Sequence, residues 1–326
     1  MSASLMTSRD QLYHPVAHIM LREQWEASYA ADIEAILRLK QEKNAVILAH
    51  NYQTPEIFHC VADIRGDSLA LARAAQTIDA DTMVMAGVHF MAETAKLLNP
   101  EKTVLIPDAT AGCSLAEGIT AENVRELKKR YPGVPVVTYV NSTADVKAES
   151  DVCCTSGNAR RIVESLGVSR VIMIPDEFLA RNIEAETGIE MLTWPAHCEV
   201  HERFTPQEIK QYRRLHPGLS VIAHPECPPD VLAAADHAGS TAQMIDFIDQ
   251  KKPPKVLLVT ECSMSDNLAA LYPQTQFVRP CNLCPHMKRI TLSNIRQALE
   301  TMQTEVTIPE HLQHPARMAV ERMLAI

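Results

Sequence analysis

The sequence lacks the features that would place the chain in a membrane or on a nucleic acid. None of its apolar runs approaches the roughly 20 residues that a membrane-spanning helix needs. The net charge is −9, and no stripe of lysine and arginine is interleaved with aromatic residues. Residues 1–20 carry charged and polar side chains where a signal peptide has an apolar core. We therefore expect a cytoplasmic protein without membrane or nucleic-acid partners.

Nucleotide-binding loops are also missing from the sequence. It contains no Gly-x-Gly-x-x-Gly and no Walker loop, so a nucleotide cofactor is not indicated. With 326 residues and 46% hydrophobic content, the chain is long enough for two or three α/β units around a large core. Because the overall charge is negative, any anionic substrate has to be attracted locally at its site.

Cysteine, by contrast, is abundant. The chain has nine cysteines, an odd number that argues against a simple disulfide framework. Residues 281–285 form Cys-x-x-Cys-Pro, a pattern typical of metal or redox sites and of iron–sulfur loops. Two thiolates cannot hold a cluster alone, and Cys113, Cys198 and Cys284 each follow a short apolar strand, 85 and 86 residues apart. This spacing predicts one cysteine in each copy of a repeated unit.

The remaining cysteines do not follow this period. Four of them lie in apolar stretches, and we interpret them as buried small apolar residues: Cys60, Cys153, Cys154 and Cys262. Cys227 lies in a loop beside a predicted site segment, but nothing in the period indicates that it is a ligand.

The same period returns in the strand, loop and helix pattern. Apolar runs that end in polar residues occur at 45–52, 136–141 and 220–226. Hydroxyl residues precede apolar helical runs at Ser68, Ser156 and Ser240-Thr241. Simple N-capping would explain any one of these hydroxyls. The recurrence of several features in the same order three times favours a repeat.

Strands that alternate with helices predict parallel sheets covered on both faces. We therefore expect an α/β fold of three similar α/β/α units with parallel sheets, arranged about a pseudo-threefold axis. The expected division is an N-terminal arm and helix at 1–44, units at 45–118, 119–203 and 204–287, and C-terminal helices at 288–326 that pack on the first unit. Helical patterns at about 23–43 and 286–302 are each expected to form one helix.

Ligands of parallel α/β units collect beyond the carboxyl ends of the strands. If the three units turn these ends inward, Cys113, Cys198 and Cys284 converge. Three thiolates on a four-iron cluster leave one iron open as a Lewis acid. The hydroxyl-bearing helix starts would reach the same space and suit carboxylate or phosphate. Polar strand-end side chains would line it as acids, bases and orienting groups: His50, Tyr52, Tyr139, Asn141, His224 and Glu226.

Several motifs of the chain resemble the quinolinate synthase family. They are Ala49-His50-Asn51-Tyr52, Gly66-Asp67-Ser68, residues 86–96, Tyr139-Val140-Asn141, Thr155-Ser156, His224-Pro225-Glu226, Gly239-Ser240-Thr241 and Cys281-Asn282-Leu283-Cys284-Pro285. The resemblance covers residues 44–287. It implies three α/β/α units and a [4Fe-4S] transferase of NAD biosynthesis. Such an enzyme condenses iminoaspartate with dihydroxyacetone phosphate and releases phosphate and two waters to form quinolinate. It also implies a possible functional coupling to an enzyme that oxidises L-aspartate.

The resemblance also implies roles for individual residues. The cluster ligands fall on Cys113, Cys198 and Cys284. Within this frame we hypothesise that Glu226 and His224 move protons during ring closure and dehydration, and that Tyr52 assists carbon–carbon bond formation or isomerisation of the triose. The other substrate-contacting positions, which would hold carboxylate and phosphate oxygens or orient the substrate, are His50, Ser68, Tyr139, Asn141, Ser156, Ser240 and Thr241.

Some alternatives remain open at this level. Cys281 could be a fourth ligand, a redox partner of Cys284 or an inert neighbour. A different iron–sulfur hydro-lyase would use the same open iron without a triose phosphate. A redox sensor or cluster carrier would explain the cysteines but leave the strand-end side chains without a purpose. A structural zinc site is disfavoured, because such sites draw paired Cys-x-x-Cys motifs from two nearby loops.

Overall fold

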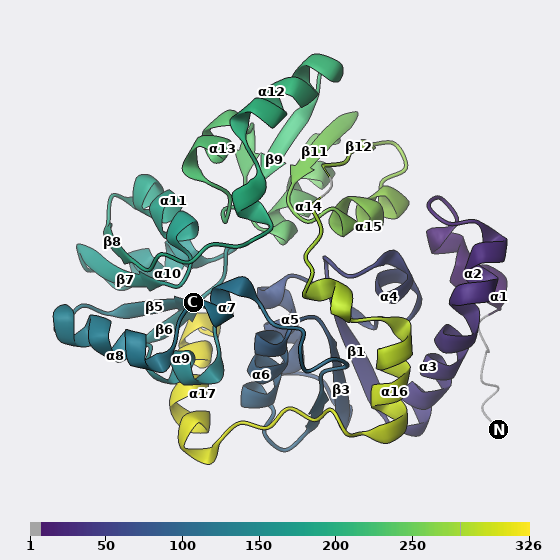
Figure 1. Ribbon diagram of the computed structural model, residues 1–326, viewed down its shortest axis with the longest axis horizontal. Helices are drawn as coiled ribbons and strands as arrows, with labels where there is room; N and C mark the ends of the chain where they lie inside the picture. Colours follow the sequence, from purple (N-terminus) through teal and green to yellow (C-terminus); the bar gives the residue numbers. More distant parts are fainter. Residues whose placement is uncertain (1–7, 281) are drawn as a thin grey trace.

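Three parallel sheets organise the molecule. The computed structural model describes residues 8–280 and 282–326. In that part of the chain the strands form three four-stranded sheets with the orders β2-β1-β3-β4, β6-β5-β7-β8 and β10-β9-β11-β12. The three sheets share one topology, because in each the first strand of the unit lies between the second and the third, and the fourth lies at the far edge. Figure 1 shows the sheets and their helices as three lobes around a centre. The predicted fold of three similar α/β/α units is confirmed.

Each unit contributes four strands and the helices that cover them. The first comprises β1 (Ala45–His50), α4 (Pro55–Cys60), β2 (Ile64–Gly66), α5 (Ser68–Ala75), β3 (Thr82–Ala86), α6 (His89–Leu98), β4 (Thr103–Leu105) and α7 (Ser114–Glu117). The second comprises α8 (Ala121–Arg130), β5 (Val136–Tyr139), α9 (Ala144–Ala148), β6 (Val152–Cys154), α10 (Ala159–Ser165), β7 (Arg170–Ile174), α11 (Glu177–Thr187), β8 (Glu190–Thr193) and η2 (His201–Arg203). The third comprises α12 (Pro206–Leu215), β9 (Ser220–Ala223), α13 (Pro229–Ala234), β10 (His237–Ala238), α14 (Thr241–Lys251), β11 (Lys255–Val259), α15 (Ser263–Leu271) and β12 (Gln276–Val278).

The central strands of each sheet are almost entirely apolar and buried. Ile47 and Leu48 in β1 have no exposed surface, and neither do Met83 and Val84 in β3. This composition follows from the parallel topology, because the connecting helices cover both faces of the sheet. Since all strands of a sheet run in the same direction, their carboxyl ends lie at one edge, where β1 pairs His50 with Gly66.

The terminal segments add shorter elements than the sequence predicts. Residues 23–43 form two helices, α2 (Arg22–Ser28) and α3 (Ala30–Glu42), because Tyr29 between them leaves helical geometry. They follow α1 (Arg9–Tyr13) and η1 (His14–Val16). Residues 286–302 are likewise divided into η3 (Met287–Arg289) and α16 (Leu292–Thr301), since Thr291 is an extended N-cap. The prediction of one helix in each range is wrong.

The last helices do not both pack on the first unit. α16 lies against α3 and β3, as expected. α17 (Glu310–Leu324) instead packs chiefly against α9 and β6 of the second unit and also touches α6 of the first. Its buried residues include Val320 and Met323. Figure 1 shows this helix in yellow beside α9 of the second unit. The prediction that the C-terminal helices pack on the first unit is therefore wrong for α17, which packs chiefly on the second.

Within the described ranges, no helix combines the length and apolar character that crossing a membrane requires.

Candidate functional site

A central cavity lies where the carboxyl ends of the strands from the three units meet. Its volume is about 720 Å³, part of which is open to solvent. Its lining includes every side chain that the sequence placed in the site except Ser240: His50, Tyr52, Ser68, Cys113, Tyr139, Asn141, Ser156, Cys198, His224, Glu226, Thr241 and Cys284. These residues are separated by up to 234 positions in the chain. The fold therefore gathers the predicted residues into one space.

The hydroxyl-bearing helix starts differ from one another. Ser68 is the first residue of α5, whose N-cap is Asp67, and Ser156 lies in the turn before α10. Ser240 is the N-cap of α14, where its hydroxyl accepts a hydrogen bond from the backbone of Gln243. Ser240 thus satisfies its own helix end. Its neighbour Thr241, rather than Ser240, lines the cavity.

Two buried histidines at equivalent strand ends have the same local geometry. The backbone N–H of Tyr52 donates to His50 Nδ1 over 3.2 Å, and that of Glu226 donates to His224 Nδ1 over 3.3 Å. Burial lowers the pKa of His50 to about 4 and that of His224 to about 3, so both imidazoles are neutral at pH 7. With Nδ1 accepting, the proton of each neutral ring is on Nε2. In His224, Nε2 lies 3.2 Å from the hydroxyl of Ser156.

Glu226 is the acceptor at the centre of the polar network. Its Oε1 accepts from the Tyr139 hydroxyl over 2.6 Å and from Asn141 Nδ2 over 3.5 Å, while Oε2 lies 2.6 Å from His201 Nδ1. Burial alone would raise the pKa of Glu226, but the imidazoles of His224 and His201 and these hydrogen bonds together bring it below its usual range. The side chain is therefore an ionised carboxylate held by three donors.

The three cysteines share one structural pattern. Each precedes a short helical turn, and each sulfur receives backbone N–H groups from the residues two and three positions later. Burial still raises the pKa of Cys113 to about 12, that of Cys284 to about 11, and that of Cys198 well above its ordinary value. Charge on Cys284 adds to the rise in the pKa of Cys113, and charge on Cys113 adds to the rise in the pKa of Cys198. Thiols with pKa values raised in this way form thiolates at neutral pH only when a cation lies beside them.

Hydrogen bonds tie the cysteine loops to one another across the units. The hydroxyl of Ser114, directly after Cys113, donates to His197 O over 3.1 Å and accepts from the backbone of Glu199 over 3.2 Å. It therefore holds both neighbours of Cys198. His286, two residues after Cys284, pairs with Glu199 over 3.0 Å. The three loops thus form one connected structure.

An ion pair between the partly exposed Lys288 and the buried Glu261 anchors the Cys284 loop. Lys288 Nζ donates to the Tyr52 carbonyl over 2.8 Å and to the hydroxyl of Ser263 over 2.6 Å, and it lies 3.1 Å from Glu261 Oε1. Glu261 also receives the backbone N–H groups of Ser263 and Cys284. This arrangement joins the first unit, the third unit and the segment after Cys284.

The donor set suits an iron–sulfur cluster. Three thiols from three units, each supported by backbone N–H groups, face one cavity, and sulfur ligands favour iron–sulfur clusters. The other cysteines assigned to the core, Cys60, Cys153, Cys154 and Cys262, are buried as predicted, and so is Cys227. Cys281, whose role the sequence left open, lies outside the described residues.

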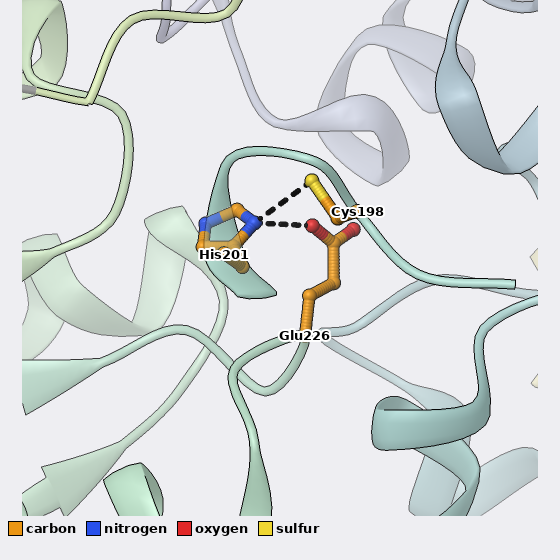
Figure 2. Close-up of side chains that lie close together, drawn as sticks. All are labelled: Cys198, His201 and Glu226. Atoms are coloured by element: carbon orange, nitrogen blue, oxygen red, sulfur yellow. Dashed lines mark hydrogen bonds and ion pairs between the residues drawn. The ribbon is translucent and has the colours of Figure 1, made fainter. Parts of the chain in front are cut away.

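Two functional candidates were missed from the sequence. His201 and Thr260 are buried beside Glu226 and Tyr52, and Figure 2 shows His201 Nδ1 facing both Cys198 and Glu226. His201 follows Cys198 by three residues, a Cys-x-x-His spacing that can bring both side chains to one site. Thr260 directly follows β11, where the third sheet presents its carboxyl edge. Neither residue occupies a position that the 85-residue period repeats.

Comparisons with known proteins agree with this arrangement. The family model described as quinolinate synthetase A protein matches residues 34–325. A protein of Mesorhizobium japonicum named quinolinate synthase 2 is 65% identical over 324 residues, covering 99% of this chain and 100% of the relative. Quinolinate synthases of Agrobacterium fabrum and Xylella fastidiosa are 63% and 66% identical, covering 98% and 90% of this chain and 92% and 87% of those relatives. The chain therefore belongs to the quinolinate synthetase A family.

Proposed function

We propose that the chain is a quinolinate synthase. It condenses iminoaspartate with dihydroxyacetone phosphate and releases phosphate and two waters in NAD biosynthesis, a transferase reaction that depends on a [4Fe-4S] cluster. A coupling to an L-aspartate-oxidising enzyme and a cytoplasmic location remain predictions from the sequence. The observation that supports the proposal most is the single cavity in which three thiols face a buried set of imidazole, phenol and carboxylate groups.

Cys113, Cys198 and Cys284 would hold the cluster. When bound by three thiolates, it supplies an iron with an open position that acts as a Lewis acid toward a hydroxyl or carboxylate oxygen. The backbone N–H groups that point at each sulfur stabilise the thiolates, and the Ser114 bridge holds two of the ligand loops at a set separation.

The remaining lining residues supply neutral donors and one strong acceptor. His50 and His224 are neutral and carry their protons on Nε2, so they can donate to carboxylate or phosphate oxygens. Glu226 is ionised and can accept a proton that leaves a substrate carbon or nitrogen. Tyr139 and Asn141 hold the carboxylate in place until substrate arrives.

The lining residues of the described chain include no lysine and no arginine. Both proposed substrates are anions, and a buried anion needs compensating donors or positive charge. The N-terminus of α14 at Thr241 and that of α5 at Ser68 offer backbone N–H groups there. The site thus suits anions through dipoles, neutral donors and the cluster rather than through basic side chains.

The direct test is an anaerobic assay with purified protein, iminoaspartate generated in place and dihydroxyacetone phosphate. Quinolinate is measured by mass spectrometry together with iron and sulfide. We expect quinolinate only when the cluster is present. A full cluster without quinolinate would refute the proposal, and turnover of a hydroxy acid without triose phosphate would identify a hydro-lyase instead.

A variant of the central carboxylate tests its role. We expect Glu226→Gln to keep iron and sulfide but to lose about 10²–10⁴-fold in kcat, the range that one general acid or base contributes. A near-normal rate would show that Glu226 is not the proton acceptor. The matched control is Glu208→Gln, at a carboxylate that caps α12 away from the cavity, where activity should be unchanged.

A further inference from the structure

A continuous chain of hydrogen bonds runs along the cavity from Tyr52 to Glu226, and Thr260 is its one member that does not line the cavity. The Tyr52 hydroxyl lies 2.5 Å from Thr260 Oγ1, and this oxygen lies 2.9 Å from His201 Nε2. His201 Nδ1 lies 2.6 Å from Glu226 Oε2 (Figure 2). Thr260 is fully buried, His201 is 1% exposed and Tyr52 is 9% exposed. Tyr52 and Glu226, which come from different units, are thus joined through two residues with no assigned role.

The single proton of the Thr260 hydroxyl couples its two hydrogen bonds. Thr260 Oγ1 lies within hydrogen-bond distance of both the Tyr52 hydroxyl and His201 Nε2. Because a threonine hydroxyl carries one proton, it can donate to only one of these two partners at a time. The direction of the bond to Tyr52 is therefore tied to the direction of the bond to His201.

The bond to Thr260 also determines how the Tyr52 hydroxyl meets the cavity that it lines. While it is bonded to Thr260, the hydroxyl has one fixed partner, which restricts its rotation and leaves its remaining hydrogen-bonding capacity for a bound substrate. Without Thr260, the hydroxyl would be free to rotate. The His201 ring would also lose its Nε2 partner, which lies opposite the contacts of Nδ1 with Glu226 and with Cys198, 3.1 Å away.

We propose that Thr260 is a positioning residue that sets the hydrogen-bond directions of Tyr52 and His201 together. Its effect on turnover rests on the proposed function. The hydrogen-bond arrangement itself is a property of the folded chain and can be measured without turnover. Thr260 suits this role because a threonine hydroxyl donates one bond and accepts another at the same oxygen.

The test compares two substitutions in the complete enzyme with its cluster. Thr260→Val keeps the shape but removes the hydroxyl, whereas Thr260→Ser keeps the hydroxyl. We expect T260V to lower kcat by about ten- to a hundredfold, the equivalent of one or two hydrogen bonds, with little change in KM. T260S should stay within about threefold of the native enzyme. Thr94→Val removes another buried threonine hydroxyl, bonded only to Phe90 O, and should leave kcat unchanged.

A second measurement reads the bond directly. In the cluster-containing full chain labelled with ¹⁵N-histidine, the Nε2 resonance of His201 is assigned by its loss in His201→Gln. It should shift in T260V and stay in place in T260S. Equal losses of kcat in both variants, or an unmoved resonance in T260V, would overturn the proposal. If the native enzyme forms no quinolinate, the proposed function fails, and the resonance still decides whether Thr260 sets the His201 hydrogen bond.

Discussion

The hydrogen bond from Tyr139 to Glu226 offers a sharp test of how burial determines the strength of a polar contact. The two oxygens are 2.6 Å apart, Tyr139 is 5% exposed and Glu226 is 4% exposed. Replacing Tyr139 by Phe removes only the hydroxyl. A hydrogen bond to a charged group contributes about 1.5–3 kcal/mol. Because water in the cavity can partly replace the lost donor, we expect Y139F to lower the free energy of unfolding by about 1–2 kcal/mol.

The chain contains a matched control for this substitution. The hydroxyl of Tyr272 donates to Asp249 Oδ1 over 2.8 Å, which is the same chemistry at an exposed position. Tyr272→Phe should change the free energy of unfolding by less than about 0.5 kcal/mol, because water screens and replaces exposed polar contacts. Urea denaturation of native protein, Y139F and Y272F measures the difference. Equal effects of the two substitutions would refute the reasoning that burial strengthens the Tyr139 bond.

The ionisation of Glu226 determines how the change in free energy of unfolding caused by Y139F depends on pH. The pKa of Glu226 lies below its ordinary value, and the Tyr139 hydrogen bond is one cause. A group with a lowered folded pKa contributes stability that is fully present above its unfolded pKa, about 4.3 for glutamate, and is lost on further acidification. The difference between native protein and Y139F should therefore be the same at pH 7 and pH 6. A difference that disappears between these values would place the stabilising charge elsewhere.

Two further substitutions test the framework around the cysteines. Ser114→Ala removes the bridge between the first two cysteine loops, and we expect about ten- to a hundredfold weaker retention of the cluster, measured as iron release to a chelator. Lys288→Met leaves the buried Glu261 without its cation, and we expect a loss of about 3 kcal/mol in the free energy of unfolding, measured in urea.

Each of these two predictions has its own control. Ser165→Ala removes a hydroxyl that bonds only to Ile162 O at the end of α10, and iron release should stay unchanged. In K288M the added substitution Glu261→Gln removes the unpaired charge and should restore part of the lost stability. Iron release from S114A at the native rate would show that the bridge does not hold the ligand loops. A K288M protein as stable as the native chain would show that Glu261 is neutral in the folded state, in line with the rise of its pKa on burial.

The repeat was readable from the sequence because it depends on local patterns. The apolar runs predicted at 45–52 and 136–141 form the strands β1 (Ala45–His50) and β5 (Val136–Tyr139), which end two residues earlier. Thr205 and Thr120 cap helices through contacts within four residues. The order of these elements determines a parallel topology, since a strand followed by a helix returns to the same sheet in the same direction. Three cysteines at one period then indicate a shared centre. Each of these inferences needs only neighbours along the chain.

The packing of the terminal helices was not readable in this way. α16 and α17 have similar amphipathic patterns, yet one lies on the first unit and the other chiefly on the second. An amphipathic helix shows which face is buried, but not which partner covers that face. The partner depends on the shapes that the three units leave between them.

The sequence by itself determined the type of fold, the three recurring cysteines and the polar strand ends, because strand and helix periodicity and loop chemistry are local. Only the tertiary structure decided how these groups contact one another. The path from Tyr52 through Thr260 and His201 to Glu226 joins residues up to 208 positions apart, and its two middle members, Thr260 and His201, lie outside the repeated pattern. Hydrogen-bond partners depend on distances of a few ångströms between units, and such distances are set only when the three units pack against each other.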